Sequence, residues 1–134
     1  MKANELMIGD WVLYDNQPHQ IRQLGIFGEN RDGEDYPAVC VGKPNGIGLI
    51  LERNEIEPIP LTPEILEKNG WVKDLYSFES YDNEELECLS LWVGKDGKNK
   101  WWWHVGVELV TPINHVHELQ HTLRLCGIEK EIIL

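Results

Sequence analysis

Two histidines four positions apart give this sequence its clearest potential for metal chemistry. His117, Glu118 and His121 form the pattern H-E-x-x-H, in a stretch with the apolar spacing of a helix. Residues four apart lie on the same side of a helix, so two imidazoles can bind one zinc ion while the glutamate activates a bound water. On this hypothesis the chain is a minimal zinc-dependent hydrolase, with zinc as cofactor and Glu118 as catalytic base.

The rest of the chain offers little to complete such a centre. A catalytic zinc takes three protein ligands, yet an extended motif would need a glycine and a histidine where Arg124 and Gly127 stand. The candidate third ligand is His104, on a neighbouring predicted strand. Because His117 and His121 fall off the apolar stripe of the predicted helix, we expect both to face water and predict no metal, cofactor or catalytic residue. That stripe consists of Val116, Leu119, Leu123 and Cys126.

Three consecutive tryptophans are the second unusual feature. Successive side chains of a strand point to opposite faces, so Trp101 and Trp103 are predicted to share one face and Trp102 to lie on the other. The first face is predicted to be core, with these further members: Val105, Val107, Leu109, Leu89, Leu91 and Val93. The opposite face is predicted to hold Trp92, Trp102, His104, Gly106, Glu108 and Ser90.

The face of Trp92, Trp102 and His104 is the predicted binding surface, and three interpretations of it stay open. The tryptophans can pack against the N-terminal part of the chain, or they can form a protein interface, since Trp is enriched at binding hot spots. Stacked indoles can also hold single-stranded bases or sugars. Local positive charge for that last role would come from the neighbouring lysines, Lys95, Lys98 and Lys100.

The elements that position these residues fall into two lobes, residues 1–60 and 61–134, which could also form one continuous compact unit. β-branched and aromatic runs between turn residues predict short strands in the first lobe. They lie at about residues 11–14, 20–27, 38–41 and 47–51, with a bulge in the second. This pattern predicts a small antiparallel β-barrel, and the opening segment from Leu6 to Val12 resembles the first strand of SH3-like barrels.

The second lobe is predicted to be an α+β layer of helix, three strands, helix and strand. Thr62 can cap the first helix, Pro63 suits its first turn and Gly70 can end it. Three strands are expected at residues 71–78, 86–93 and 101–110. A second helix is expected from Pro112 to about Cys126, with Gly127 as its stop, followed by a strand over residues 128–134.

Three segments carry a resemblance to known proteins. They are Met1–Leu6, Glu57–Trp71 and His115–Gln120, and they lie in the same order along the whole chain. Together they resemble uncharacterised small proteins of gut-bacterial genomes and their mobile or prophage elements. The resemblance implies a cytoplasmic bacterial or phage origin, and it transfers no activity and no site residue.

Composition narrows the function further. The 134 residues carry 12 basic and 23 acidic side chains, a net charge of −11, which disfavours binding to double-stranded nucleic acid. Three cysteines without metal-ligand spacing predict reduced thiols, and no apolar run is long enough to span a bilayer. We therefore expect a non-enzymatic, cytoplasmic interaction or accessory module that binds a protein partner or a second copy of itself. Zinc-dependent hydrolysis and single-stranded nucleic acid binding are the alternatives.

Overall fold

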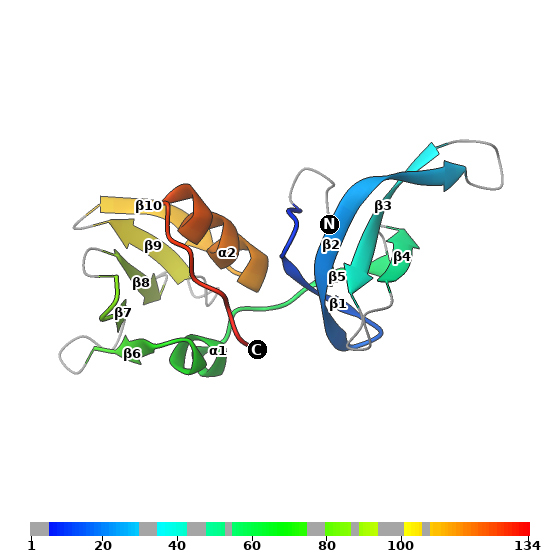
Figure 1. The fold of residues 1–134 in the computed structure, drawn as a ribbon. Coiled ribbons are helices and arrows are strands. Elements are labelled where there is room, and N and C mark those ends of the chain that lie inside the picture. Colours follow the sequence, from blue (N-terminus) through cyan, green and yellow to red (C-terminus); the bar gives the residue numbers. More distant parts are fainter. Residues whose placement is uncertain are drawn as a thin grey trace. The chain divides into compact units, whose positions relative to one another are not determined.

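The chain forms two compact units, residues 1–59 and 60–134, each built on its own five-stranded antiparallel sheet (Figure 1). The computed structural model describes residues 6–29, 35–42, 48–52, 55–74, 80–86, 89–93, 101–105 and 108–134. Two short helices in the second unit make the described chain a mixed α+β protein in which sheet predominates. Neither of these helices has the length and apolar character needed to cross a membrane.

The first sheet has the strand order β4-β3-β2-β1-β5. Its strands are β1 (Trp11–Tyr14), β2 (Gln17–Glu29), β3 (Asp35–Gly42), β4 (Gly48–Glu52) and β5 (Glu57–Pro58). The four predicted strands are confirmed, as is the bulge in β2, where the register with β3 shifts between Ile21 and Gln23. Asp15 and Asn16 both have positive φ, 49° and 58°, so they make the tight two-residue turn between β1 and β2 that a right-handed strand twist favours.

The predicted closed barrel is wrong, because this sheet is open along the described strands. β4 and β5 are its two edges. β5 is only two residues long, and Pro58 has no N–H to donate to a further strand. The apolar side of the sheet still encloses a core, which consists of Leu6, Val12, Ile21, Val39, Val41, Leu51 and Ile56.

The second unit begins with the predicted helix α1 (Pro63–Lys68). The Thr62 hydroxyl accepts a hydrogen bond from the N–H of Ile65 at 3.3 Å, and Gly70 follows the helix with φ 89°, so the predicted start and stop are both confirmed. A sheet in the order β10-β9-β8-β7-β6 follows. Its strands are β6 (Trp71–Lys73), β7 (Ser80–Asn83), β8 (Leu89–Val93), β9 (Trp101–Val105) and β10 (Glu108–Ile113).

Several predicted elements of this unit differ in the structure, and two of the differences involve β10. The single strand expected over residues 101–110 is two antiparallel strands, because Val105 of β9 pairs with Glu108 of β10. Pro112 does not begin a helix but lies in β10, at the edge of the sheet, where a missing N–H is tolerated. The second helix, α2, therefore starts later and spans Val116–Leu125.

Gly127 ends α2 as predicted. It has φ 73°, and its N–H donates to the carbonyl of Arg124, while the N–H of Ile128 donates to the carbonyl of Leu123 at 2.9 Å. This pair of bonds is the Schellman arrangement, which needs a left-handed residue where the chain leaves the helix.

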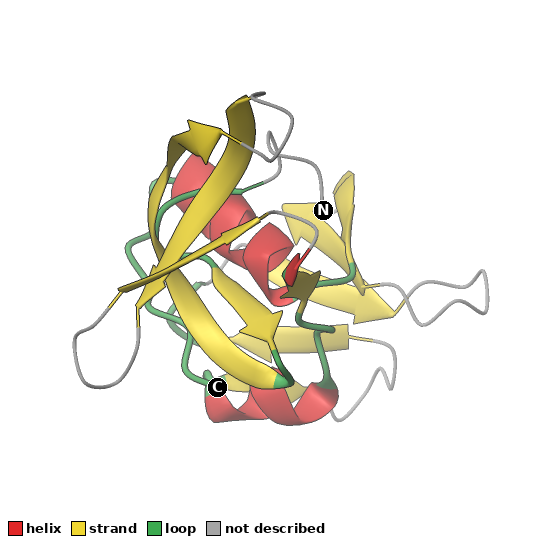
Figure 2. Ribbon diagram, turned by 90° about the vertical axis from the view of Figure 1, so that its right-hand side faces the viewer, coloured by secondary structure: helices red, strands yellow, loops and turns green. Residues whose placement is uncertain are grey.

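The C-terminal segment is not the predicted strand: residues 128–134 have no regular secondary structure, and the backbone of Ile133 is bound by a side chain. The Asn69 amide donates to the carbonyl of Ile133 and accepts from its N–H, both at 2.7 Å. The same amide group also donates to the carbonyl of Ile65 at 2.8 Å, so it links α1 to the C-terminal segment. Figures 1 and 2 both show the C-terminus beside α1.

Candidate functional site

The H-E-x-x-H segment lies on α2, but not as predicted. His117 is buried, with 4% of its surface exposed, so the expectation that it faces water is wrong. His121 is half-buried, and Cys126, predicted on the apolar stripe, is exposed. The buried positions of α2 span roughly 160° of the helix, because an imidazole and an amide widen the apolar stripe. These positions are Val116, His117, Leu119, Gln120 and Leu123.

Three imidazoles follow one another along the start of this helix. The ring of His115, directly before the helix, stacks on the ring of His117 with centroids 5.6 Å apart and planes 16° apart. The His117 ring meets that of His121 edge to face, also at 5.6 Å. Within the residues that the structure describes, no three His, Cys, Asp or Glu side chains converge as ligands of one metal ion. His104 lies in β9, paired with Ser90 and Leu109, and its side chain lies outside the described part.

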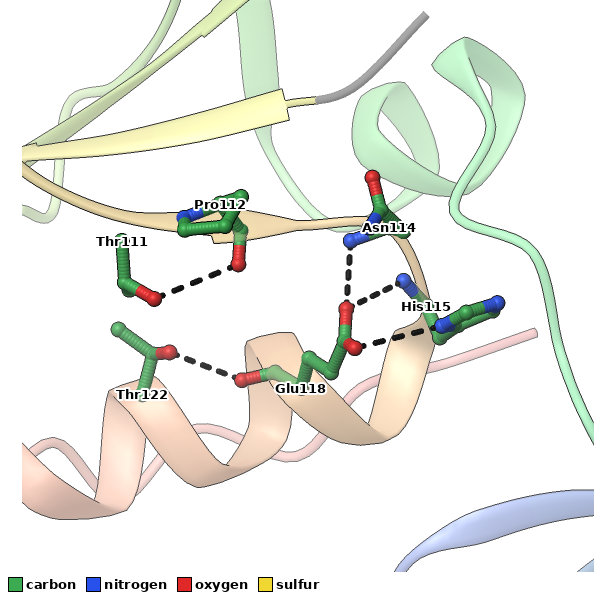
Figure 3. Close-up of polar contacts among 6 residues, drawn as sticks. All are labelled: Thr111, Pro112, Asn114, His115, Glu118 and Thr122. Carbon is green, nitrogen blue, oxygen red and sulfur yellow. Dashed lines mark hydrogen bonds and ion pairs between the residues drawn. The ribbon is translucent and has the colours of Figure 1, made fainter. Parts of the chain in front are cut away.

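Glu118 caps the helix (Figure 3). Its carboxylate accepts the N–H of Asn114 at 2.6 Å and the N–H of His115 at 3.0 Å, and it lies 3.4 Å from Nδ1 of the His115 ring. Partial burial of the carboxylate acts to raise its pKa, but the two N–H groups and the His115 ring outweigh burial and hold the pKa of Glu118 below its ordinary value. A carboxylate held at the positive end of a helix in this way is a weak base, which does not suit activation of water.

The tryptophan strand divides between two faces, as predicted. Trp101 and Trp103 are buried, with 7% and 0% exposed, and Leu91 beside Trp103 on β8 is fully buried. Trp101 is fixed from two sides: Nε1 donates to the carbonyl of Leu61 at 3.2 Å, and the ring of Tyr81 meets the indole edge to face at 5.1 Å. This face of the second sheet is therefore core. Figure 1 shows α2 lying against this sheet.

Two members of these faces were predicted wrongly, because the chain reverses after Val105. Leu109 pairs with His104, on the face opposite Trp103, whereas Glu108 pairs with Val105 on the same side as Trp103. Residues paired directly across strands lie on one side of a sheet, so each assignment is exchanged. The predicted members Gly106 and Val107 lie outside the described residues.

The side of the second sheet opposite Trp101 and Trp103 is its outer face. Direct cross-strand pairs arrange it as two rows, one residue from each strand. The first row is Asp74, Ser80, Trp92, Trp102 and Pro112, and the second is Val72, Asp82, Ser90, His104 and Leu109. The predicted binding residues Trp92, Trp102 and His104 therefore occupy adjacent register positions.

Several outer-face residues are accessible to solvent. Val72 is 62% exposed, Asp82 and Pro112 are exposed, and Trp102 is half-buried. Tryptophan is among the residue types enriched at protein interfaces, so the accessible Trp102 makes this face a candidate binding surface. The sequence did not reveal Val72, Asp82 and Pro112 as members of the face. The places of Val72 and Asp82 depend on β7, and that of Pro112 depends on β10, and neither strand was predicted.

The outer face also carries two carboxylates. Asp82 has a raised pKa, first because of partial burial and second because of the negative charge of Asp74. The N–H of Asp74 donates to the carbonyl of Ser80 at 2.9 Å, which extends the β6–β7 ladder and puts Asp74 diagonally opposite Asp82. Two neighbouring acidic side chains give this corner of the face a negative electrostatic potential.

No family model, curated protein sequence or solved structure matches this chain.

Proposed function

We propose that this chain is a non-enzymatic interaction module that binds a protein partner on the outer face of its second sheet. The observation that carries the proposal is the half-buried indole of Trp102 on the same face as the exposed side chain of Val72. Tryptophan in such a position is the residue type most enriched among binding hot spots. A cytoplasmic, bacterial mobile-element or phage origin, from the resemblance of the sequence, belongs to the same proposal.

The first unit supports this proposal by an analogy of fold. Its strand order, β4-β3-β2-β1-β5, is the order of SH3-like sheets, and we propose that it is an open variant of that architecture. Such small sheets serve as interaction modules in many unrelated proteins, so the analogy favours binding over catalysis without assigning a partner.

Selection of peptides on the immobilised protein tests the proposal. A random peptide library is enriched on the wild type, and each enriched peptide is then measured against Trp102→Ala and against Trp11→Ala. Trp11 is a half-buried tryptophan of the first unit, so its variant is a matched control. We expect enriched peptides that lose binding with Trp102→Ala and keep it with Trp11→Ala. An absence of enrichment, or equal loss in both variants, would refute the proposal.

The zinc hydrolase is retained as a second candidate because the rings of His117 and His121 adjoin each other. It needs His117 and His121 as ligands, with His104 as the candidate third ligand and Glu118 as base. Glu118 is engaged by two backbone N–H groups. Zinc content per chain, measured after purification without chelators, separates the candidates. One zinc per chain that is lost in His121→Ala would favour the hydrolase over the interaction module.

Single-stranded nucleic acid is the remaining alternative occupant of the outer face. A titration with oligothymidylate, followed by tryptophan fluorescence at low and high salt, tests it directly. Salt-sensitive quenching that disappears in Trp102→Ala would replace the protein partner with a nucleic acid.

A further inference from the structure

We propose that two copies of this chain form a dimer by exchanging their C-terminal segments, residues 128–134, so that the last three residues of each copy bind beside α1 of the other. The inference goes beyond the proposed function, because the contacts that carry it involve no residue of the outer face. Three features of the second unit support it: the site that holds the segment, the connection that leads to this site from α2, and the glycine at the end of that helix.

The site beside α1 binds the segment largely through its backbone, so it accepts an identical segment from a second copy equally well. The buried amide of Asn69 binds the N–H and the carbonyl of Ile133, both at 2.7 Å. Lys68 donates to the carbonyl of Leu134, and Ile132 adds an apolar side chain that is only 1% exposed. When the segment leaves, the Asn69 amide loses two hydrogen bonds, and an unsatisfied buried polar group favours rebinding of a segment from either copy.

The connection from α2 to this site, residues 127–131, is attached weakly. Its first residue, Gly127, is exposed, and a cavity of about 560 Å³ is lined by the end of α2 and by the connection. Lys130 binds Glu85 at 3.3 Å and lies 6.0 Å from the centre of the Trp71 ring, but 76% of the glutamate side chain is exposed. Exposed ion pairs contribute little to stability, so the connection detaches at little cost in free energy.

Gly127 determines whether the chain returns to α1 or continues as a helix. With φ 73° it turns the chain back toward α1 (Figure 1), whereas a helical φ at this position would extend α2. The residues on either side suit a helix, because leucine, arginine, glutamate and lysine are good helix formers and glycine is a poor one. Helical extension over residues 126–131 adds about 9 Å to α2, which carries residues 132–134 away from their own site.

The exchanged dimer keeps the contacts of the closed chain except those of the connection, so the conformation of Gly127 decides the balance between monomer and dimer. Alanine at this position is strained by the positive φ of the closed chain, although its Cβ would meet no atom within 4 Å. In the extended helix of the dimer, alanine is favourable. Gly127→Ala should therefore shift the equilibrium toward the dimer.

Size-exclusion chromatography with light scattering, over a range of protein concentrations, measures this equilibrium. We expect the dimer dissociation constant to be at least about tenfold lower in Gly127→Ala than in the wild type, because both chains of the dimer are relieved of strain. Gly70→Ala is the matched control: Gly70 also follows a helix with positive φ, 89°, but its strain is equal in both states, so the dissociation constant should not change. Absence of a dimer in Gly127→Ala, or equal effects of the two variants, would overturn the proposal.

A synthetic peptide of residues 128–134 tests whether the exchanged segment joins the copies. Added in excess to the Gly127→Ala dimer, the peptide should fill the sites beside α1 and release monomers that carry bound peptide. The same peptide with Ile132→Asp should leave the dimer intact, because it brings a charge to the place of a buried isoleucine. A dimer that persists with the first peptide, or that both peptides dissociate equally, would show that the copies associate elsewhere and would overturn the exchange.

Discussion

Replacement of Glu118 by alanine should destabilise the protein by about 1–2 kcal/mol through loss of a helix cap. The carboxylate satisfies the N–H groups of Asn114 and His115, which have no partner within the helix. Hydrogen bonds to a charged acceptor are stronger than neutral ones, but 35% of this side chain is exposed and solvent screens its charge. The expected loss is therefore in the range of an ordinary cap, not of a buried ion pair.

The same prediction has a definite dependence on pH. The pKa of Glu118 is lower in the folded protein than its ordinary value, so the carboxylate stabilises the fold at pH values above the unfolded-state pKa. This contribution is lost as the pH falls through the folded-state pKa, because protonation removes the charge that the N–H groups bind. Glu118→Gln should thus lose about half as much as Glu118→Ala at pH 7, and wild type and Glu118→Gln should converge in acid.

Urea denaturation at pH 7 and at pH 3 measures both effects. The exposed Glu129, changed to glutamine, is the matched control, and its free energy of unfolding should equal that of the wild type. If Glu118→Ala unfolds like the wild type, the cap does not contribute as reasoned. If Glu118→Gln instead abolishes a zinc-dependent hydrolytic activity at unchanged stability, the carboxylate is a base and the interpretation of α2 is wrong.

Three further changes test the fold. Asn69→Ala should lower the free energy of unfolding by about 2–4 kcal/mol, because the buried amide binds both backbone groups of Ile133. The N–H of Ile133 should then exchange faster with solvent, and an unchanged exchange rate would contradict this link. Gly127→Ala should lower the free energy of unfolding by only about 1–2 kcal/mol. An added Cβ would meet no atom within 4 Å, so the loss comes only from the positive φ of 73°. An unchanged free energy of unfolding would contradict the left-handed conformation at the end of α2. Trp103→Ala should cost about 3–5 kcal/mol in urea unfolding, and Trp102→Ala clearly less, because only Trp103 is fully buried. The reverse order would exchange the two faces of the sheet.

Helix caps, helix stops and the alternation of side chains along a strand could be predicted from the sequence, because each depends only on residues close together in the chain. The cap and stop of α1, the Gly127 stop and the division of Trp101 and Trp103 from Trp102 all depend on neighbours in the sequence, and the structure confirms them. The reversal between β9 and β10 was missed because an apolar run continues through residues 101–110 and conceals the end of one strand. Without β7 and the correct β10, half of the outer face could not be assembled from sequence.

The burial of His117 shows that the width of a buried helix face is hard to predict from the sequence. An apolar stripe identifies the centre of a buried helix face but not its width, and polar residues at the margin are buried or exposed according to what packs there. His117 and Gln120 lie at that margin or within it, and both are buried. His115, outside the motif, stacks on His117 because the chain enters the helix there, which no spacing rule indicates.

The bond between Asn69 and Ile133 has a consequence for synthesis on the ribosome. Chains emerge from the N-terminal side, so α1 leaves the exit tunnel long before the residue that completes its surroundings. Contacts this distant along a chain are slow to form, and the bond to Asn69 cannot form until Ile133 has left the tunnel. Stalled nascent chains that end before Ile133 should accordingly be degraded by protease over residues 60–74, while those with Ile133 outside the tunnel resist.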